Sequence, residues 1–160
     1  MNIMLPLIQN GLQRVLEGRR FNRCIDLGCG TGDGARILRF HVDYLMGVDN
    51  SEEHIHIAES TGLYDELILD DVRHYWPSGD LVVLMEVIEH LSHEEGDALL
   101  RRISYIPNLI LSTPRDFFPN PPSMPHLSIW TEEELWQYGF ETQLLFAWFQ
   151  PTIILGTKFA

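Results

Sequence analysis

A glycine-rich turn follows the first strongly apolar run of the chain. Gly28, Gly30 and Gly32 alternate strictly after Asp26. Glycines directly after a buried strand let the backbone turn sharply and approach a ligand closely. The spacing differs from the Gly-x-Gly-x-x-Gly fingerprint of dinucleotide-binding proteins, and no phosphate-binding lysine follows. The turn therefore predicts a site for a nucleotide-like ligand, and a nicotinamide-dependent dehydrogenase remains an alternative.

Acidic residues close the next two apolar runs. Asp49 ends the second one, where a carboxylate can accept hydrogen bonds from both hydroxyls of an adenine ribose. Asp70 and Asp71 end the third one, and they either contact the same ligand or only cap a turn. These positions extend the candidate ligand site from the first strand to the third.

A cluster of two glutamates and a histidine follows the fourth apolar run. If this segment is helical, Glu86, Glu89 and His90 lie at positions i, i+3 and i+4 and share one face. Such a set could hold a divalent metal, and oxygen-rich ligation favours magnesium or manganese over structural zinc. In a second interpretation His90 is a general base. In a third, Glu89 caps a helix and His90 fills space against the sheet.

The elements that position these residues alternate between strand and helix. Apolar residues at helical spacing predict helices over the first 18 residues, around Ala35 to Leu38, after Ser51, from His93 to Ser104 and after Thr131. The predicted strands cover residues 23–27, 44–49, 66–71, 80–85, 108–113, 141–149 and 152–159. This order predicts an α/β fold, a doubly wound, mostly parallel seven-stranded sheet that ends in an antiparallel hairpin.

The composition limits the classes of function. A chain of 160 residues has the length of one domain, and we expect residues 1–160 to form it. The 11 Lys and Arg against 23 Asp and Glu give a net charge of −12, which disfavours unaided binding to nucleic acid. Cys24 and Cys29 lack the spacing of a zinc or disulfide framework. No signal peptide or membrane span is indicated, so we expect a soluble cytoplasmic protein that does not bind membranes.

The segment from Thr113 to Trp130 contains five prolines and is expected to be an irregular active-site loop. Phe117 and Phe118 within it are candidates for closing over an acceptor. Trp130 either lines the substrate pocket or fills the core. His54 and His56 are expected to be surface residues of the predicted helix after Ser51.

The series Asp-Leu-Gly-Cys-Gly-Thr-Gly (26–32), Gly-Val-Asp (47–49) and Asp-Asp-Val (70–72) resembles the cofactor-binding series of class I, Rossmann-like S-adenosylmethionine-dependent methyltransferases. The resemblance covers roughly the whole chain. It implies that Asp49 holds the ribose hydroxyls and that Asn50 lies beside the adenine. Asp71 would accept from the exocyclic amine of the adenine, and Val72 would offer its amide to a ring nitrogen. It also implies that the methionine and ribose parts are contacted by the turn and the acid before it: Asp26, Gly28, Cys29, Gly30 and Gly32.

The Glu-x-x-Glu-His run resembles a more particular family, the small-RNA 3′-terminal 2′-O-methyltransferases. That family has a later histidine before an aromatic-Thr helix start, which His126 matches here. The resemblance implies a metal that coordinates the terminal ribose hydroxyls and is bound by Glu86, Glu89, His90 and His126. The chain departs from the family in its acidity, in Arg115 where the family tends to have Asn, and in having no RNA-binding module.

The expected activity is methyl transfer from S-adenosylmethionine to a hydroxyl or amine of a small molecule. Glu86 or His90 would take the proton of the acceptor during in-line displacement at the sulfonium. One alternative is metal-dependent 2′-O-methylation of RNA ribose. Another is a non-catalytic, cofactor-binding subunit of a complex.

Overall fold

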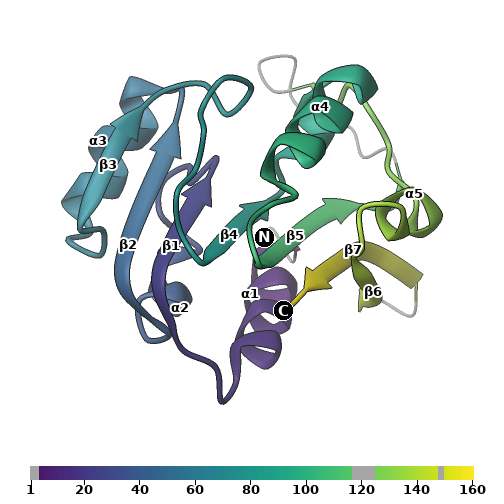
Figure 1. Ribbon diagram of the computed structural model, residues 1–160, viewed down its shortest axis with the longest axis horizontal. Coiled ribbons are helices and arrows are strands. Elements are labelled where there is room, and N and C mark those ends of the chain that lie inside the picture. The colour runs from purple at the N-terminus through teal and green to yellow at the C-terminus, as the bar shows by residue number, and fades with distance from the viewer. Residues whose placement is uncertain (1–3, 117–124, 148–149) are drawn as a thin grey trace.

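One seven-stranded sheet organises the protein, in the strand order β3-β2-β1-β4-β5-β7-β6 (Figure 1). The computed structural model describes residues 4–116, 125–147 and 150–160. The predicted doubly wound, mostly parallel sheet with an antiparallel C-terminal pair is confirmed. The strands are β1 (Phe21–Leu27), β2 (Val42–Asp49), β3 (Glu66–Leu69), β4 (Leu81–Met85), β5 (Asn108–Pro114), β6 (Glu141–Ala147) and β7 (Gln150–Lys158).

Strands β1 to β5 are parallel, so their carboxyl ends meet at one edge of the sheet. The chain order reverses beside β1: β2 pairs with one side of it and β4 with the other. Asp26, near the end of β1, is in register with Gly47 of β2 and Val83 of β4. Ligands of open α/β sheets bind in the crevice at such a reversal, so the topology already places the glycine turn at the expected site.

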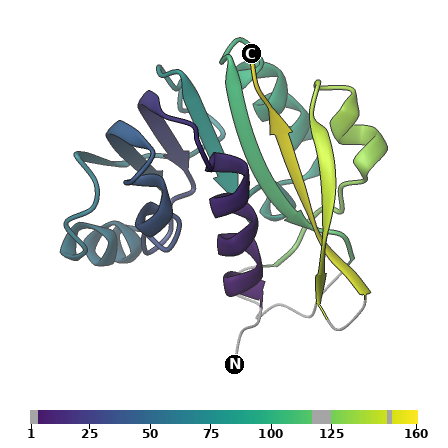
Figure 2. The same ribbon diagram turned by 90° about the horizontal axis from the view of Figure 1, so that it is seen from below.

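Helices cover both faces of the sheet, with α1 and α4 on opposite sides (Figure 2). On one face, α1 (Met4–Leu16) and α2 (Ala35–Leu38) bury Leu12, Leu16 and Leu38 against the strands. α3 (Glu52–Ser60) packs beside β2 and β3. On the other face, α4 (His93–Ile103) and α5 (Glu132–Trp136) pack over a second apolar layer. None of the helices within the described ranges combines the length and apolar character needed to cross a membrane.

Side-chain caps fix the starts of three helices. The Ser51 hydroxyl accepts from the His54 amide at 3.3 Å and starts α3. Ser92 with Glu95, and Thr131 with Glu134, form reciprocal capping boxes that start α4 and α5. A box of this kind satisfies amides that would otherwise lack partners in the first helical turn. The capped start of α4 fixes the chain directly after residues 86–90, which we call the Glu-His segment.

The C-terminal strands differ in detail from the predicted hairpin. β7 is antiparallel to both β5 and β6 and lies between them, so the second strand of the pair is internal and β6 is at the edge. The predicted strand 141–149 is found as Glu141–Ala147, and its last two positions lie outside the described residues; the predicted strand 152–159 is corrected to Gln150–Lys158.

The third strand is also shorter than predicted, because it ends at Leu69. The Asp70 amide still donates to the Asp49 carbonyl, at 3.0 Å. The Asp71 carbonyl then accepts from the amides of His74 and Tyr75, so the chain turns instead of extending.

Candidate active site

A cavity of about 550 Å³ opens at the carboxyl ends of the parallel strands. It is lined by residues from α1, the glycine turn, the ends of β2 and β4, and the segment after β3. Gly32, Glu89 and His126 are not among its described lining residues. The cavity brings together most of the residues that the sequence singled out: Asp26, Gly28, Cys29, Gly30, Asp49, Asn50, Asp71, Val72, Glu86 and His90.

The glycine turn is built against the neighbouring strand. The amides of Gly28 and Cys29 donate to the Val48 carbonyl at 2.8 and 3.0 Å. Gly28 has φ +75°, and a Cβ there would lie 2.5 Å from Cγ2 of Val87. Only glycine combines this backbone conformation with so close an approach. The turn therefore leaves its backbone, and no side chain, facing the cavity at this point.

Asp26 lies buried beneath the turn. Its carboxylate accepts a hydrogen bond of 2.8 Å from the Tyr64 hydroxyl. Burial raises the pKa of Asp26 to about 6, because the charged form loses its hydration, and the Tyr64 hydrogen bond partly opposes this rise. The charge of this carboxylate consequently depends on pH near neutrality.

Asp49 closes β2 with its carboxylate held by protein donors. Oδ2 accepts from the Gly30 amide at 2.9 Å, and Oδ1 accepts from the Ser51 amide at 2.9 Å. The ring nitrogen Nδ1 of His54 lies 3.2 Å from Oδ1. The two histidines expected at the surface differ: the side chain of His54 is 32% exposed and its ring lines the cavity, whereas the side chain of His56 is 83% exposed. Sequence reasoning missed His54 because its spacing to Asp49 carries no periodic signal.

Asp71 does not present a free carboxylate to the cavity. The Arg73 guanidinium donates to both of its oxygens, with Nε at 3.0 Å from each, and this pairing lowers the pKa of Asp71. Arg73 also bridges to Glu95 at 2.9 Å, which ties the segment after β3 to the first turn of α4. The Val72 carbonyl accepts from Arg102. Arg73 lines the cavity and is a second residue that sequence reasoning missed.

Glu86 adopts an unusual backbone conformation at the end of β4. Its φ is +57°, the left-handed region that non-glycine residues seldom enter. Ser112 holds it from β5: the Ser112 hydroxyl donates to Glu86 Oε1 at 2.7 Å, and the Glu86 amide donates to the Ser112 carbonyl at 3.1 Å. Burial raises the pKa of Glu86 above its usual range, because the charged form loses its hydration. Backbone strain of this kind gathers at functional sites.

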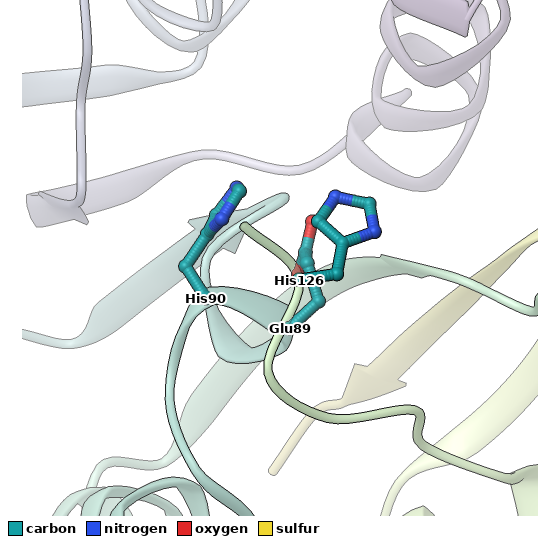
Figure 3. A group of neighbouring side chains, drawn as sticks. All are labelled: Glu89, His90 and His126. Atoms are coloured by element: carbon teal, nitrogen blue, oxygen red, sulfur yellow. The ribbon is translucent and has the colours of Figure 1, made fainter. Parts of the chain in front are cut away.

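The prediction of one helical face for Glu86, Glu89 and His90 is wrong. Helical backbone begins only at Ile88, in the short 3-10 helix η1 (Ile88–His90). Glu86 remains hydrogen-bonded to β5 as a continuation of the strand pairing, so it cannot join that turn. The side chains that gather are Glu89, His90 and His126, whose candidate ligand atoms all lie within 4.8 Å of one another (Figure 3).

This three-residue group combines a buried carboxylate with two imidazoles. Glu89 Oε2 accepts from the Thr113 hydroxyl at 3.3 Å, while Oε1 is buried with no hydrogen-bond partner in the described structure. Burial raises the pKa of Glu89, and the charge of Glu86 adds to the rise. Nδ1 of His90 lies 3.1 Å from the Pro125 carbonyl, an acceptor only, so Nδ1 must carry the hydrogen. Nε2 of His90 is then left for a proton or a metal.

Residues 125–130, the described end of the proline-rich segment, are hydrogen-bonded to the backbone of Glu89 in this group. The amides of Leu127 and Ser128 donate to the Glu89 carbonyl at 2.7 and 3.2 Å. Trp130 is 1% exposed and its Nε1 donates to the Ser128 hydroxyl, so it fills the core and does not line the cavity. Phe117 and Phe118 lie outside the described residues.

Comparisons with known proteins agree with this architecture. A family model described as a methyltransferase domain matches residues 24–106, more than half of the 160-residue chain. No curated protein matches the chain in sequence.

Several solved structures share the fold at low sequence identity. The magnesium protoporphyrin IX methyltransferase ChlM from Synechocystis PCC 6803 with bound SAH is 19% identical, with a TM-score of 0.74 over 97% of this chain and 84% of that one. The N-methyltransferase NodS from Bradyrhizobium japonicum WM9 is 15% identical, with a TM-score of 0.75 over 98% and 97%. The methyltransferase domain of bacterial CtHen1-C is 21% identical, with a TM-score of 0.71 over 98% and 99%.

The family match spans the glycine turn, Asp49, the segment after β3 and the Glu-His segment. The solved structures reproduce the same sheet across nearly the whole chain. The chain therefore belongs to the methyltransferase-domain family, as its resemblance to class I S-adenosylmethionine-dependent methyltransferases predicted.

Proposed function

We propose that this methyltransferase binds S-adenosylmethionine in the cavity and transfers its methyl group to a hydroxyl or amine of a small molecule. The observation that carries the proposal is the Asp49 carboxylate, fixed by the Gly30 amide at 2.9 Å beside the close backbone approach at Gly28. A cavity of about 550 Å³ has room for a nucleoside cofactor and part of an acceptor. ChlM, a fold neighbour, has been solved with bound SAM and with bound SAH.

The proposed cofactor contacts follow the order of the strands. Gly28, Cys29, Gly30 and Gly32 of the turn, and Asp26 beneath it, would lie along the methionine and ribose parts. Asp49 would bind the ribose, with Asn50 beside the adenine. Val72 would offer its amide to the adenine ring, and Asp71 would accept from the exocyclic amine while remaining paired with Arg73. When bound, the cofactor supplies a methyl group already activated by the sulfonium.

The residues around the acceptor side then have separate roles. The hydrogen bond from Nδ1 to the Pro125 carbonyl leaves Nε2 of His90 as the acceptor for a proton from the substrate. Glu86, held by Ser112, would orient the reacting hydroxyl or amine. Apolar residues complete the lining, including Leu5, Met85 and Leu127, and they would exclude water from the reacting atoms.

The small-molecule acceptor is supported by charge and by the fold neighbours. The net charge of −12 opposes a polyanionic substrate. ChlM and NodS are named for methylation of a porphyrin and for N-methylation. Cys24 and Cys29 are both free thiols, which supports the cytoplasm, a reducing compartment, as the place of action.

Calorimetry with S-adenosylhomocysteine tests the cofactor site. We expect micromolar binding to the wild-type protein and at least about a tenfold loss in Asp49→Asn, since a charged hydrogen-bond acceptor is removed. Asp43→Asn, on the same strand but exposed and paired with Arg20, is the matched control and should bind normally. Absence of binding by the wild type, or tighter binding of a nicotinamide cofactor, would contradict the proposal.

Turnover separates the enzyme from a cofactor-binding subunit. We expect S-adenosylhomocysteine to form when the protein is incubated with S-adenosylmethionine and a panel of small hydroxyl and amine acceptors. His90→Gln should lose about a hundredfold or more in rate, because it removes the base, while binding the cofactor normally. Cofactor binding without turnover on any acceptor would favour the non-catalytic subunit.

A second candidate function, metal-dependent 2′-O-methylation of RNA ribose, is favoured by the unpartnered Oε1 of Glu89. A buried carboxylate oxygen without a donor among the described residues, next to the two imidazoles of His90 and His126, fits manganese better than magnesium, which prefers oxygen ligands. These three residues would hold it, and Glu86 would reach it only by leaving Ser112. Bound metal would make a coordinated hydroxyl more acidic.

Manganese titration decides between the two candidates. Under the second one, the wild type binds manganese and Glu89→Gln does not, while Glu94→Gln, an exposed position in the first turn of α4, binds as the wild type does. Manganese should then also stimulate methylation of an RNA 3′ end. Failure of the wild type to bind manganese would remove this candidate and leave the metal-free reaction.

A further inference from the structure

His54 is a histidine whose ring lies against the candidate ribose-binding carboxylate. It is in the first turn of α3, where its amide is fixed by the Ser51 hydroxyl at 3.3 Å. Its Nδ1 lies 3.2 Å from Asp49 Oδ1, and its half-buried ring lines the cavity. Backbone capping and the Asp49 contact together hold the ring at the cavity wall.

The hydrogen bonds to Asp49 leave it too few acceptor positions for a ribose. Each carboxylate oxygen has about two lone-pair directions. On Oδ1 both are used, by the Ser51 amide and by His54. On Oδ2 one is used, by the Gly30 amide. A ribose has two neighbouring hydroxyl donors, so Asp49 in this arrangement can accept only one of them.

We propose that His54 binds the second hydroxyl of the cofactor ribose through Nε2, so that the ribose is held by a carboxylate and an imidazole together. A carboxylate only accepts, so Nδ1 of His54 carries the hydrogen that faces Asp49. Nε2 has no hydrogen-bond partner within the described parts of the chain. In neutral imidazole this nitrogen accepts, and a ribose hydroxyl can donate to it. The proposal rests on the proposed function, because it assumes that a nucleoside cofactor occupies the cavity.

The competing arrangement has Asp49 bind both hydroxyls by itself. That arrangement requires the His54 ring to leave Oδ1, after which the ring would contribute nothing to affinity. The two arrangements therefore predict different affinities. If His54 binds a ribose hydroxyl, removing the imidazole weakens binding only of ligands that carry that hydroxyl. If Asp49 binds both hydroxyls, removing the imidazole does not weaken binding of any of the ligands.

A double cycle of protein and ligand changes measures this dependence by calorimetry. The ligands are S-adenosylhomocysteine and its 2′-deoxy and 3′-deoxy analogues. The proteins are the wild type, His54→Ala and His54→Phe, which keeps a ring without nitrogen. His56→Ala is the matched control, because it is a histidine on the same helix with an 83% exposed side chain.

We expect His54→Ala and His54→Phe to bind S-adenosylhomocysteine about tenfold more weakly than the wild type, the equivalent of one hydrogen bond. One of the two deoxy analogues should bind the wild type about as much more weakly than S-adenosylhomocysteine does as the His54 variants bind S-adenosylhomocysteine itself. Both His54 variants should bind that analogue and S-adenosylhomocysteine with equal affinity. His56→Ala should behave as the wild type.

Two outcomes overturn the inference alone. In one, the His54 variants bind S-adenosylhomocysteine with wild-type affinity. In the other, each His54 variant binds each deoxy analogue more weakly by the product of the two separate losses of affinity, so that the imidazole and the hydroxyl act independently. If the wild type does not bind S-adenosylhomocysteine at all, the proposed function fails first and the inference fails with it.

Discussion

The Tyr64 hydroxyl donates a 2.8 Å hydrogen bond to the buried carboxylate of Asp26, which is 38 residues away in the sequence. Burial raises the pKa of Asp26 from 3.8 to about 6 against the opposing effect of this bond. The folded protein therefore binds this proton more tightly than the unfolded chain does. Asp26 makes the free energy of unfolding fall as pH rises from about 4 to about 6.

Tyr64→Phe should extend that decline to higher pH, because the pKa of Asp26 rises further without the hydroxyl. We expect the variant to lose about 1–3 kcal/mol at pH 8 and less at pH 5.5, measured by urea unfolding. Tyr44→Phe is the control, since its hydroxyl donates to Glu66, an exposed carboxylate, at 2.9 Å. An equal loss for Tyr64→Phe at both pH values would disprove the link to Asp26.

Gly28→Ala should destabilise the protein by steric overlap in addition to backbone strain. The new Cβ would lie 2.5 Å from Val87 in a residue with φ +75°. Gly62, with φ +65° and nothing within 4 Å of an added Cβ, isolates the strain contribution. We expect about 1 kcal/mol of loss for Gly62→Ala and about 1–3 kcal/mol more for Gly28→Ala, in thermal unfolding. Only Gly28→Ala should also weaken S-adenosylhomocysteine binding.

Substitution of Glu86 by glycine should destabilise the protein less than substitution by glutamine, the reverse of the order expected within a helix. The Glu86 φ of +57° is strained for glutamate and relaxed for glycine, so Glu86→Gly should be about 1 kcal/mol more stable than Glu86→Gln. Glu94, in the first turn of α4, should show the opposite order by a similar amount. Neither Glu86 variant should transfer methyl groups at the wild-type rate. If glycine is the less stable substitution at both positions, the backbone strain at Glu86 contributes nothing measurable.

Gly96 and Trp130 should be coupled in stability. A Cβ at Gly96 would lie 2.4 Å from Cζ2 of the buried Trp130 ring, so Gly96→Ala should cost about 1–3 kcal/mol. Trp130→Phe shortens the ring, and the double variant should lose less than the sum of the single losses. Both variants should bind S-adenosylhomocysteine normally, because Trp130 lies in the core. Weakened binding by Trp130→Phe in a folded protein would instead give it a role in the cavity.

The parts of the fold that the sequence predicted are those with a periodic or local signal. Alternating apolar runs located all seven strands, and Ser51 and Thr131 marked helix starts that the side-chain caps confirm. The glycine turn was found because its conformation is specific to one residue type. The boundary errors at Leu69 and at Gln150 have a common reason: strand ends are set by partners across the sheet, and one sequence does not contain that pairing.

The parts of the site that the sequence could not predict depend on contacts between distant segments. The i, i+3, i+4 spacing would join Glu86 to a helix with Glu89 and His90, but it ignores Ser112, which is 26 residues away and holds Glu86 on the strand. Arg73 pairs with Glu95 across 22 residues and left no recognisable motif. His54 resembled the neighbouring His56 in sequence context, and only the fold separates the ring at the cavity from the ring in solvent.

The internal position of β7 constrains how this chain can fold during its synthesis on the ribosome. β7 provides the pairing for β5 on one side and β6 on the other, although it is made after both of them. While residues 150–158 are still in the exit tunnel, the nascent chain has β5 with an open edge and β6 without its neighbour. Such an edge can pair with other chains. The half of the sheet that carries the glycine turn can form early, whereas the other half must wait for β7 to insert between β5 and β6.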